Sequence, residues 1–497
     1  MTSTPMTRRT LLQGVAVGAA AAITGRATRS ARGAGTPALI TSPDSGPTSA
    51  DWIALAHSIE GDVLQRTNPA YPRAKQLFNP RFDSVAPLAV VQALNASDVQ
   101  QIINFAHKFT LQPRGKAGGH SYVGASTVQN GLVIDVSRIT FAQYYPGSRV
   151  ASVGAGAKLF PVHQTLAGHG RTIPTGTCPT VGAAGLTLGG GLGVASREYG
   201  LTCDSLTGIT MVTADGQIRV VNRDSFPDLF WAHRGGGGGN FGVVTSMRFN
   251  TQPALPMGFF LIDFPYSHAS NVVRGWAARI KAMPNTVWAN LHLEASSNGT
   301  AQVRIVGVCR AGAEAGQALA MESAIGVAPS SVSTFSKSFL DGITFLGGGT
   351  TSPRTGFAAG SDVLVSMPDS LSTSLPALVA RRAASHQSAA VILDPLTGAV
   401  QHTLPGASAF PYRRHLASVQ WYVGMPAHPT PGQLQSTYDW IGTGHATVRA
   451  SSAGGYVNYL EPRRAVSSYY GANYARLQQV KRVFDPSGFF DFAFGIQ

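Results

Sequence analysis

Residues Pro113–Tyr122 spell PRGKAGGHSY, a glycine-rich loop that contains a single histidine. Successive glycines let backbone N–H groups turn inward and cradle a phosphate group, and Lys116 adds a positive charge beside them. A lone histidine is more often a packed residue than a functional one, so His120 needs a second feature to gain a role. By itself the loop predicts a phosphate-binding segment.

A second glycine-rich segment, Gly176–Gly185, reads GTCPTVGAAG and continues into GGGLG at Gly189–Gly193. Such backbone allows a flat cofactor that carries a pyrophosphate to approach closely. A cysteine taken alone is usually a small buried residue, which is what we expect of Cys203 and Cys309. Cys178 differs because it lies inside this segment. One histidine and one cysteine in two glycine-rich contexts favour a cofactor site over simple packing.

Several common catalytic motifs are missing from the sequence. It has no Gly-x-Ser-x-Gly elbow, no His-Glu-x-x-His, no Cys-x-x-Cys and no Walker loop, so no metal site is expected. One Gly-x-Gly-x-x-Gly match occurs at Gly237, Gly239 and Gly242. It follows a helix-like segment, 228–233, and precedes a strand, which is the reverse of a dinucleotide-binding turn. NAD is therefore not the expected cofactor.

Composition limits the class of protein. The chain has 497 residues, 44% of them hydrophobic and 12% charged, which is enough for a large core and too long for one ordinary domain. Its three cysteines, an odd number, exclude a disulfide scaffold. The net charge of +14 suggests an anionic partner. However, no basic helix, zinc-finger spacing or RNP-type motif supports nucleic-acid binding, and no apolar run reaches membrane-spanning length.

The first 35 residues have the character of an export signal. They contain five arginines and no acid, since the first acidic residue is Asp44. The segment Thr7–Leu12, TRRTLL, leads into a short apolar run, Leu11–Thr24. We expect a twin-arginine-type signal over residues 1–35, rather than a disordered basic tail, and therefore a secreted protein that acquires its cofactor before export. Without these arginines, 33 basic and 24 acidic residues leave a charge of +9.

The glycine-rich loops fall within a first predicted domain, residues 80–252. Apolar patterning predicts strands over 85–91, 132–136, 150–153 and 243–249, a helix over 96–109, and a hairpin over 209–221 that turns at 214–216. Because helices and strands are mixed here without regular alternation, the domain is predicted to be α+β.

A second domain is predicted over residues 255–450. Strands are expected over 259–264, 287–295, 302–308 and 416–423, and helices over 270–283, 312–325 and 431–442. This order predicts an antiparallel sheet covered by helices on one face. The aromatic and glycine-rich stretch 455–497 is expected to return to the first domain.

Five segments match one known family in order. They are GGHS at 118–121, the Cys178 loop with SREYGL at 196–201, DLFW at 228–231 with RGGGGGNFG at 234–242, YVNY at 456–459, and YGANYARL at 470–477. With these segments the chain resembles the berberine-bridge-enzyme-like branch of the vanillyl-alcohol oxidase superfamily, flavoenzymes with a PCMH-type FAD-binding domain. The resemblance runs from about residue 80 to the end and implies FAD as cofactor.

The resemblance implies roles for individual residues. FAD would be attached twice, through His120 to the flavin 8α-methyl group and through Cys178 to C6, and both side chains are nucleophiles. Tyr459 matches the family's catalytic tyrosine and Gln420 its partner; the alternative is that both only pack. A phenol titrates near pH ~10, so Tyr459 would need nearby donors or cations to act as a base. Val181 resembles a gatekeeper that admits O2. The other residues implied in FAD binding are Lys116, Ala117, Gly118, Gly119, Ser121, Thr177, Gly182, Gly185, Val244, Asn473 and Tyr474.

The chain departs from the family pattern at three points. Lys116 stands where relatives often have arginine, which keeps the charge but loses the fork geometry. Residues 394–398, DPLTG, stand where relatives often show Tyr-Gly-Gly, and the C-terminal residues 489–497 end differently. These differences affect the substrate assignment more than the cofactor assignment. His292, on a predicted strand of the second domain, is expected to pack rather than to bind substrate.

The function that follows is FAD-dependent oxidation. An alcohol or sugar carbon would lose a hydride to the flavin, and O2 would take the electrons to give H2O2. The alternatives are oxidative tailoring or ring closure of a natural product, and a non-catalytic carbohydrate binder. The intact set of His120, Cys178 and Tyr459 argues against the binder. The expected partners are a small molecule and O2, with neither nucleic acid nor a membrane span.

Overall fold

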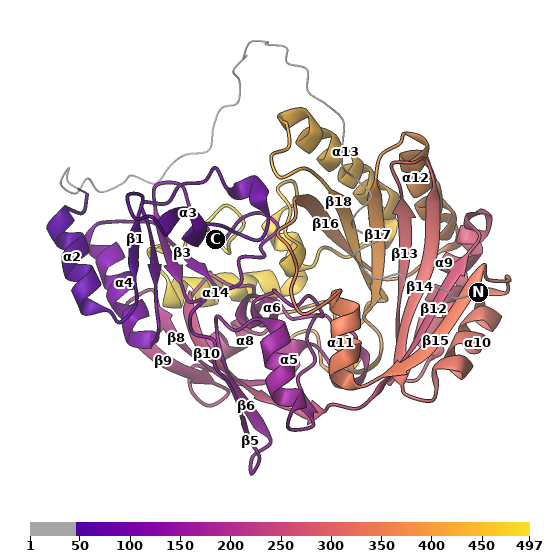
Figure 1. Ribbon diagram of the computed structural model, residues 1–497, viewed down its shortest axis with the longest axis horizontal. Coiled ribbons are helices and arrows are strands. Elements are labelled where there is room, and N and C mark those ends of the chain that lie inside the picture. Colours follow the sequence, from indigo (N-terminus) through magenta and orange to yellow (C-terminus); the bar gives the residue numbers. More distant parts are fainter. Residues whose placement is uncertain (1–45) are drawn as a thin grey trace.

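The computed structural model describes residues 46–497, which form two sheet-based units side by side (Figure 1). The predicted export signal lies outside the described residues. The first unit holds a four-stranded sheet with the order β1-β2-β4-β3 and a five-stranded sheet with the order β5-β6-β10-β8-β9. In the first sheet β2 and β3 pair with β4 in parallel, whereas the second sheet is antiparallel. The α+β prediction is confirmed.

The elements of the first unit include most of those predicted from apolar patterning. The strands are β1 (Val63–Gln65), β2 (Ala89–Gln92), β3 (Pro113–Lys116), β4 (Leu132–Asp135), β5 (Ala142–Tyr145), β6 (Val150–Gly154), β7 (Arg171–Thr172), β8 (Leu206–Thr213), β9 (Ile218–Asn222), β10 (Gly242–Asn250) and β11 (Gln252–Pro253). The helices are α2 (Ser49–Ser58), α3 (Tyr71–Ala74), α4 (Ala96–Lys108), α5 (Leu159–Ala167), α6 (Ala183–Leu188), α7 (Ser196–Tyr199) and α8 (Pro227–Ala232).

Helix α4 shows how the local sequence produces these elements. Asn95 caps its first turn by accepting a hydrogen bond from the backbone N–H of Asp98. Val99, Ile102 and Ala106 then recur on one face and are fully buried in the core of the unit. The helix predicted over 96–109 is therefore confirmed, as is the β8–β9 hairpin.

The second unit is built on one seven-stranded antiparallel sheet with the order β15-β12-β14-β13-β17-β18-β16. Its strands are β12 (Met257–Phe264), β13 (Trp288–Ala295), β14 (Ala301–Arg310), β15 (Ser331–Lys337), β16 (Phe357–Leu364), β17 (Ala389–Pro395) and β18 (Ala417–Gly424). Its helices are α9 (Ala269–Ala282), α10 (Glu314–Ile325), α11 (Phe339–Gly347), α12 (Asp369–Ala384) and α13 (Pro431–Val448). The predicted antiparallel sheet with helices is confirmed.

Side chains alternate across this sheet. On β13, Ala289, Leu291 and Leu293 are buried in a core that also contains Trp276 of α9. The intervening residues Asn290 and His292 point to the opposite face, where they line a cavity between the two units. One face is thus apolar and covered by helices, and the other looks toward the first unit (Figure 1). On that second face polar side chains line the cavity, whereas Phe259, Trp288 and Val308 pack with α11.

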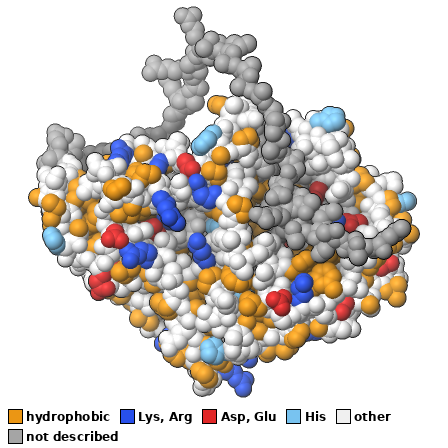
Figure 2. Space-filling view, viewed as in Figure 1, with side chains coloured by type: hydrophobic (Ala, Val, Ile, Leu, Met, Phe, Trp, Pro, Cys, Tyr) orange, Lys and Arg blue, Asp and Glu red, His pale blue; other side chains and the backbone are white. Residues whose placement is uncertain are grey.

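The C-terminal segment packs into the first unit. Tyr469, Tyr470, Phe490 and Ile496, together with Leu477 of α14 (Tyr474–Phe484), belong to the same hydrophobic core as the strands of the two smaller sheets. This core also includes α2, upstream of residue 80. None of the helices within residues 46–497 is both long and apolar enough to cross a membrane. On the face shown in Figure 2, basic side chains are interspersed with acidic ones.

Candidate active site

A large cavity of about 2220 Å³ lies between the glycine-rich loops and the polar face of the seven-stranded sheet. The loops that follow β3 and β7 line one side, and β13, β17 and β18 line the other. The cavity therefore joins the first unit to the second. Most of the residues predicted to bind the cofactor line it, namely Lys116, Ala117, Gly118, Gly119, His120, Ser121, Thr177, Cys178, Val181, Gly182, Gly185 and Val244.

The two glycine-rich segments cross at Gly118 and Gly182. A Cβ added to either residue would lie under 3.0 Å from backbone atoms of the other, which real side chains essentially never do. Gly119, the next residue, has φ +67°, a left-handed conformation that favours glycine. The sequence needs glycine here because two loops approach closely and turn sharply.

His120 presents a neutral imidazole at the cavity. Burial, together with the nearby charge of Lys158, lowers its pKa to about 4, against which a backbone hydrogen bond with Thr180 acts weakly. Its ring stacks on Phe78 with centroids 3.9 Å apart. The Nε2 atom is buried and has no hydrogen-bond partner within residues 46–497. An unprotonated ring with a free nitrogen is the form that acts as a nucleophile.

Cys178 is the second nucleophile at this cavity. It is half-buried and not in a disulfide, and its Sγ lies 3.8 Å from Thr180 Oγ1 and 3.9 Å from Ser352 Oγ. Cys203 and Cys309 are buried, as expected, and burial raises the pKa of both thiols. Among the three cysteines only Cys178 lines the cavity.

The charge predicted for Lys116 is neutralised in the structure. Its Nζ lies 3.0 Å from Asp135 Oδ2, because parallel pairing of β3 and β4 sets these two residues side by side. The lysine therefore lines the cavity as half of an ion pair, and its role beside a phosphate group stays a prediction. Arg114, two residues earlier on β3, is buried and lines the cavity. It forms no ion pair within residues 46–497. Sequence reasoning missed it.

The YVNY motif is fastened to the second glycine-rich segment. The backbone N–H of Gly191 donates to Tyr456 Oη at 3.0 Å, and Asn458 Nδ2 donates to Leu186 O at 2.9 Å. A Cβ on Gly189 would collide with the Asn458 side chain. Tyr459 closes the motif in a short 3-10 helix, Val457–Tyr459, and lines the cavity.

Tyr459 does not face the cavity alone. Its ring stacks on that of Tyr122, with centroids 5.0 Å apart and planes 7° apart. Gln420 Nε2 donates to Tyr122 Oη at 2.6 Å, so the structure connects Gln420 to the pair through Tyr122. Burial raises the pKa of Tyr122 well above its usual range, and the neighbouring Tyr459 adds to this effect. Sequence reasoning assigned no role to Tyr122, although its position two residues after His120 was an available signal.

Two predicted cofactor residues lie away from the cavity lining. Asn473 Nδ2 donates to the carbonyl groups of Pro405 and Ser408, and so fastens a loop of the second unit. Tyr474 stacks on Tyr470 against the core of the first unit. Their side chains make contacts outside the cavity lining, and their assignment to cofactor binding stays a prediction.

The far end of the cavity is rich in hydrogen-bonding groups. His292 lines it and contacts Glu294 at 3.1 Å, so it is not merely packed as expected. Arg304 of β14 lies beside them, held by both carboxylate oxygens of Asp263. Within residues 46–497, no three His, Cys, Asp or Glu side chains are placed to hold a metal ion.

Comparisons with known proteins agree with this site. A family model described as FAD binding domain matches residues 87–222, and one described as berberine and berberine like matches residues 455–497. The FAD-linked oxidoreductase YgaK of Bacillus subtilis is 29% identical over 87% of this chain and 96% of its own. A carbohydrate oxidase of Microdochium nivale is 28% identical over 84% of this chain and 89% of its own.

A solved structure is similar over nearly the whole chain. It is the xylooligosaccharide oxidase from Myceliophthora thermophila C1 in complex with xylobiose, with TM-score 0.78 and 26% identity over 89% of this chain and 98% of that one. Fold, cavity and matches together define an FAD-linked oxidoreductase. The chain belongs to the berberine-bridge-enzyme-like family, with a PCMH-type FAD-binding domain and FAD as its cofactor.

The residues of this chain fit FAD. The glycine crossing at Gly118 and Gly182 leaves backbone without side chains beside the cavity, and Arg114 brings an unpaired positive charge to it. The buried Nε2 of His120 has no hydrogen-bond partner in the part of the chain that the structure describes. A large planar anion with reactive ring positions matches this donor set.

Proposed function

We propose that the protein is an FAD-dependent oxidase that takes a hydride from a CH–OH carbon of an oligosaccharide. The observation that carries the proposal is the continuity of the cavity. It runs from the loops of His120 and Cys178, past Tyr459, across the polar face of the seven-stranded sheet. A space of this kind accommodates an extended substrate as well as the cofactor.

The lining of the second unit supports a sugar substrate. Sugars present many hydroxyl groups, which pair with mixed donors and acceptors. Such side chains gather on β13, β14, β17 and β18, and they are Asn290, His292, Glu294, Gln302, Arg304, Asp394 and Gln420. Relatives described as a carbohydrate oxidase and as a xylooligosaccharide oxidase with xylobiose point in the same direction.

In this proposal the side chains handle the proton of the substrate hydroxyl. Bound FAD accepts the hydride and is reoxidised by O2, which yields H2O2. Tyr459 takes the hydroxyl proton as general base. Tyr122, whose raised pKa keeps it neutral, holds the Tyr459 ring by stacking and is itself held by Gln420. A neutral partner keeps its hydroxyl hydrogen available as a hydrogen-bond donor.

We also infer that FAD is attached covalently at two points, His120 and Cys178. Two nucleophiles of different chemistry line the same cavity, and one of them is a neutral imidazole with an unpartnered nitrogen. Two bonds would fix the isoalloxazine ring and make it a stronger oxidant.

Export is a separate proposal, which rests on the TRRTLL segment at 7–12 and the apolar run behind it. A bacterial host with and without a functional twin-arginine pathway tests it. We expect holoprotein outside the cytoplasm only in the competent host. Replacing Arg8 and Arg9 by lysine should abolish export, and unchanged export would refute the signal.

The oxidation proposal is tested by H2O2 release from a panel of cello- and xylo-oligosaccharides, simple alcohols and aromatic alkaloid precursors. Peroxide formed at the rate of sugar oxidation, with an aldonic acid or lactone product, supports the proposal. Turnover of an alkaloid precursor without sugar oxidation would support oxidative tailoring instead. Sugar binding without flavin reduction would indicate a carbohydrate binder.

A further inference from the structure

The segment that carries Tyr459 crosses strand β16, the last strand of the seven-stranded sheet, along the edge that no other strand of the sheet covers. β16 pairs with β18 on one side, and on the other side its backbone bonds to residues 452–456. The N–H of Val363 donates to Gly454 O, and the N–H of Tyr456 donates to Ser361 Oγ. Tyr459 then lines the cavity on the polar face of the sheet.

Two residues later the same segment reaches the helix-covered face. Glu461 lies over Gly360 of β16, where a Cβ would collide with its carboxylate. Its side chain is 1% exposed. The segment therefore places a residue at the active site on one face and a buried charge on the other, with the edge strand between them.

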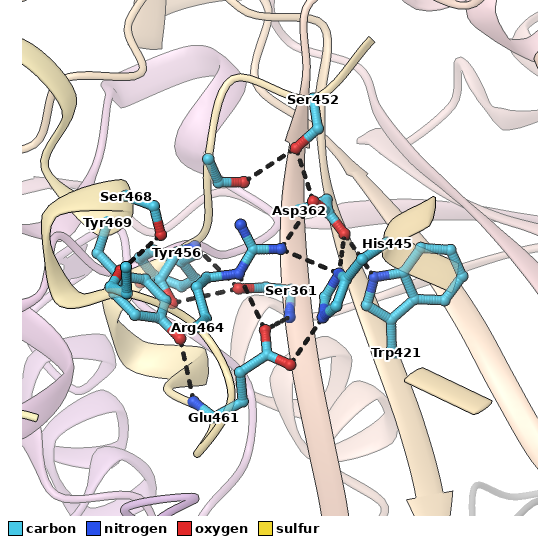
Figure 3. Close-up of polar contacts among 12 residues, drawn as sticks. Ser361, Asp362, Trp421, His445, Ser452, Tyr456, Glu461, Arg464, Ser468 and Tyr469 are labelled. Atoms are coloured by element: carbon cyan, nitrogen blue, oxygen red, sulfur yellow. Dashed lines mark hydrogen bonds and ion pairs between the residues drawn. The ribbon is translucent and has the colours of Figure 1, made fainter. Parts of the chain in front are cut away.

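Glu461 belongs to a buried network of four charged side chains, which we call the His445 cluster. Its members are Asp362 of β16, His445 of α13, Glu461 and Arg464 (Figure 3). His445 Nδ1 lies 2.5 Å from Asp362 Oδ2, and His445 Nε2 lies 2.7 Å from Glu461 Oε2. Arg464 bridges the same two carboxylates, at 2.8 Å and 3.0 Å. Each acid thus has two cationic partners.

The charges of the cluster balance only when His445 is protonated. Both ring nitrogens lie within hydrogen-bond distance of carboxylate oxygens, and Nδ1 also lies 2.9 Å from Nη2 of Arg464. Only the imidazolium form donates to both carboxylates at once. Two carboxylates then face one guanidinium and one imidazolium. Burial opposes this protonation, but the hydrogen bonds and charges of Asp362 and Glu461 outweigh it and raise the pKa of His445 to about 9. Loss of that proton would leave a net negative charge in a buried site.

The surrounding groups add no further change of charge in this pH range. Trp421 of β18 donates from Nε1 to Asp362 Oδ2, and Ser452 donates to Asp362 Oδ1. The phenols of Tyr412 and Tyr469 lie near Asp362 and Glu461 respectively, and burial raises the pKa of each. His445 is therefore the group whose protonation sets the charge of the cluster.

We propose that the His445 cluster is a charge-balanced clamp that sets the position of Tyr459 in the cavity, an inference that rests on the role proposed for Tyr459. The clamp joins α13 and β16 to the C-terminal segment. Because it fixes Glu461, and the edge of β16 fixes residues 452–456, the backbone between them holds Tyr459 at one place in the cavity. The cluster touches neither substrate nor cofactor, so its members are positioning residues.

Charge substitutions test the clamp in the holoenzyme by stopped-flow flavin reduction with xylobiose or cellobiose. His445→Gln keeps a hydrogen-bonding side chain but unbalances the cluster. We expect a reduction rate constant about 10- to 100-fold lower at pH 7, the penalty that a misplaced catalytic group typically brings. In the parent the rate constant should fall near pH 9, as His445 loses its proton, and this fall should be absent from His445→Gln. His445→Gln/Glu461→Gln restores neutrality and should recover most of the rate, whereas a double variant as slow as the single one would overturn the clamp.

A matched control lies in the same segment. Arg463 forms an ion pair with Asp439, but both side chains are exposed, by 43% and 57% of their surface. Arg463→Gln should leave the reduction rate and its pH profile unchanged, since exposed ion pairs contribute little. Glu461→Gln covers the case in which His445→Gln does not fold. With one carboxylate fewer, Asp362 and Arg464 balance each other when His445 is neutral, so the loss of rate near pH 9 should disappear. A rate that still falls near pH 9 would contradict the proposal.

A probe at position 459 separates the clamp from the proposed oxidation. Replacing Tyr459 by 4-trifluoromethylphenylalanine gives one 19F resonance from a group that has no proton to lose. Its chemical shift should titrate near pH 9 in the otherwise unchanged protein and should not titrate with His445→Gln. That result, combined with no sugar oxidation by the parent enzyme, would sink the proposed function and keep the clamp. Sugar oxidation with a 19F signal insensitive to His445→Gln would do the opposite.

Discussion

Tyr122 and Tyr459 stack face to face, 5.0 Å apart between ring centroids, although 337 positions separate them in the chain. Tyr122 follows the His120 loop of the first unit, and Tyr459 ends the segment 452–459, which crosses strand β16 of the second. The pair thus joins the first glycine-rich loop to the C-terminal segment at one wall of the cavity. The pair therefore sets the tyrosine that we propose as general base beside a neutral tyrosine at the junction of the units.

Replacing Tyr459 by phenylalanine removes the phenol oxygen and keeps the stacked ring. We expect flavin to stay bound and its reduction by an oligosaccharide to slow about 100-fold or more, the usual contribution of a general base. Anaerobic stopped-flow absorbance measures the rate constant. Tyr145→Phe, at an exposed tyrosine of β5, should leave that rate unchanged. Equal rates for parent and Tyr459→Phe would remove Tyr459 as the base.

The two proposed attachments are separable. His120→Ala and Cys178→Ala, each alone, should leave yellow flavin in the acid-precipitated pellet, because one bond suffices to retain it. The double variant should release flavin into the supernatant. Cys309→Ala, at a buried thiol away from the cavity, should behave as the parent. Flavin that leaves the parent protein on acid precipitation would refute covalent attachment altogether.

The loop crossing makes a stability prediction. In Gly118→Ala the added methyl group would lie under 3.0 Å from backbone atoms of Gly182, and neither loop has a flexible side chain that can move aside. We expect a loss of about 2–3 kcal/mol in free energy of unfolding, as overpacked sites show. Gly316→Ala, at an exposed site in α10 with nothing within 4 Å, should be neutral or slightly stabilising. Thermal unfolding of both variants decides; an unchanged Tm for Gly118→Ala would show that the loops yield.

The sequence predicted the elements whose apolar residues repeat regularly, such as α4, α9 and the β8–β9 hairpin. It missed β16, FAAGSDVL, because small and polar residues there conceal a strand whose eight residues are all buried. Ser361 and Asp362 are buried in this strand only because distant groups satisfy them, and no local pattern reports such partners. Hydrophobic periodicity therefore did not reveal β16, the strand that the segment 452–459 crosses.

The candidate site was predicted to a similar extent. Glycine spacing placed His120 and Cys178 at the cavity, since both depend on local loop chemistry. The ion pair of Lys116 was not foreseen, because its partner Asp135 comes from the neighbouring strand β4, and the register of the two strands is not evident from the sequence. The hydrogen bond from Gln420 to Tyr122 likewise depends on how the two units meet. Whether Gln420 also acts on Tyr459 stays a prediction.

Buried histidines predict how stability depends on pH. Burial lowers the pKa of His163 to about 4, and its Nε2 lies 2.7 Å from Thr175 Oγ1. In the unfolded chain the group titrates near its ordinary 6.5, so between pH 6.5 and 4 only the unfolded state gains the proton. Stability is therefore complete above pH 6.5 and falls as pH drops toward 4, by roughly 3 kcal/mol over the window. Denaturant midpoints at pH 7 and 4.5 should fall further for the parent and for His57→Gln, at an exposed histidine, than for His163→Gln. Equal falls in all three proteins would show that His163 is already protonated in the folded state.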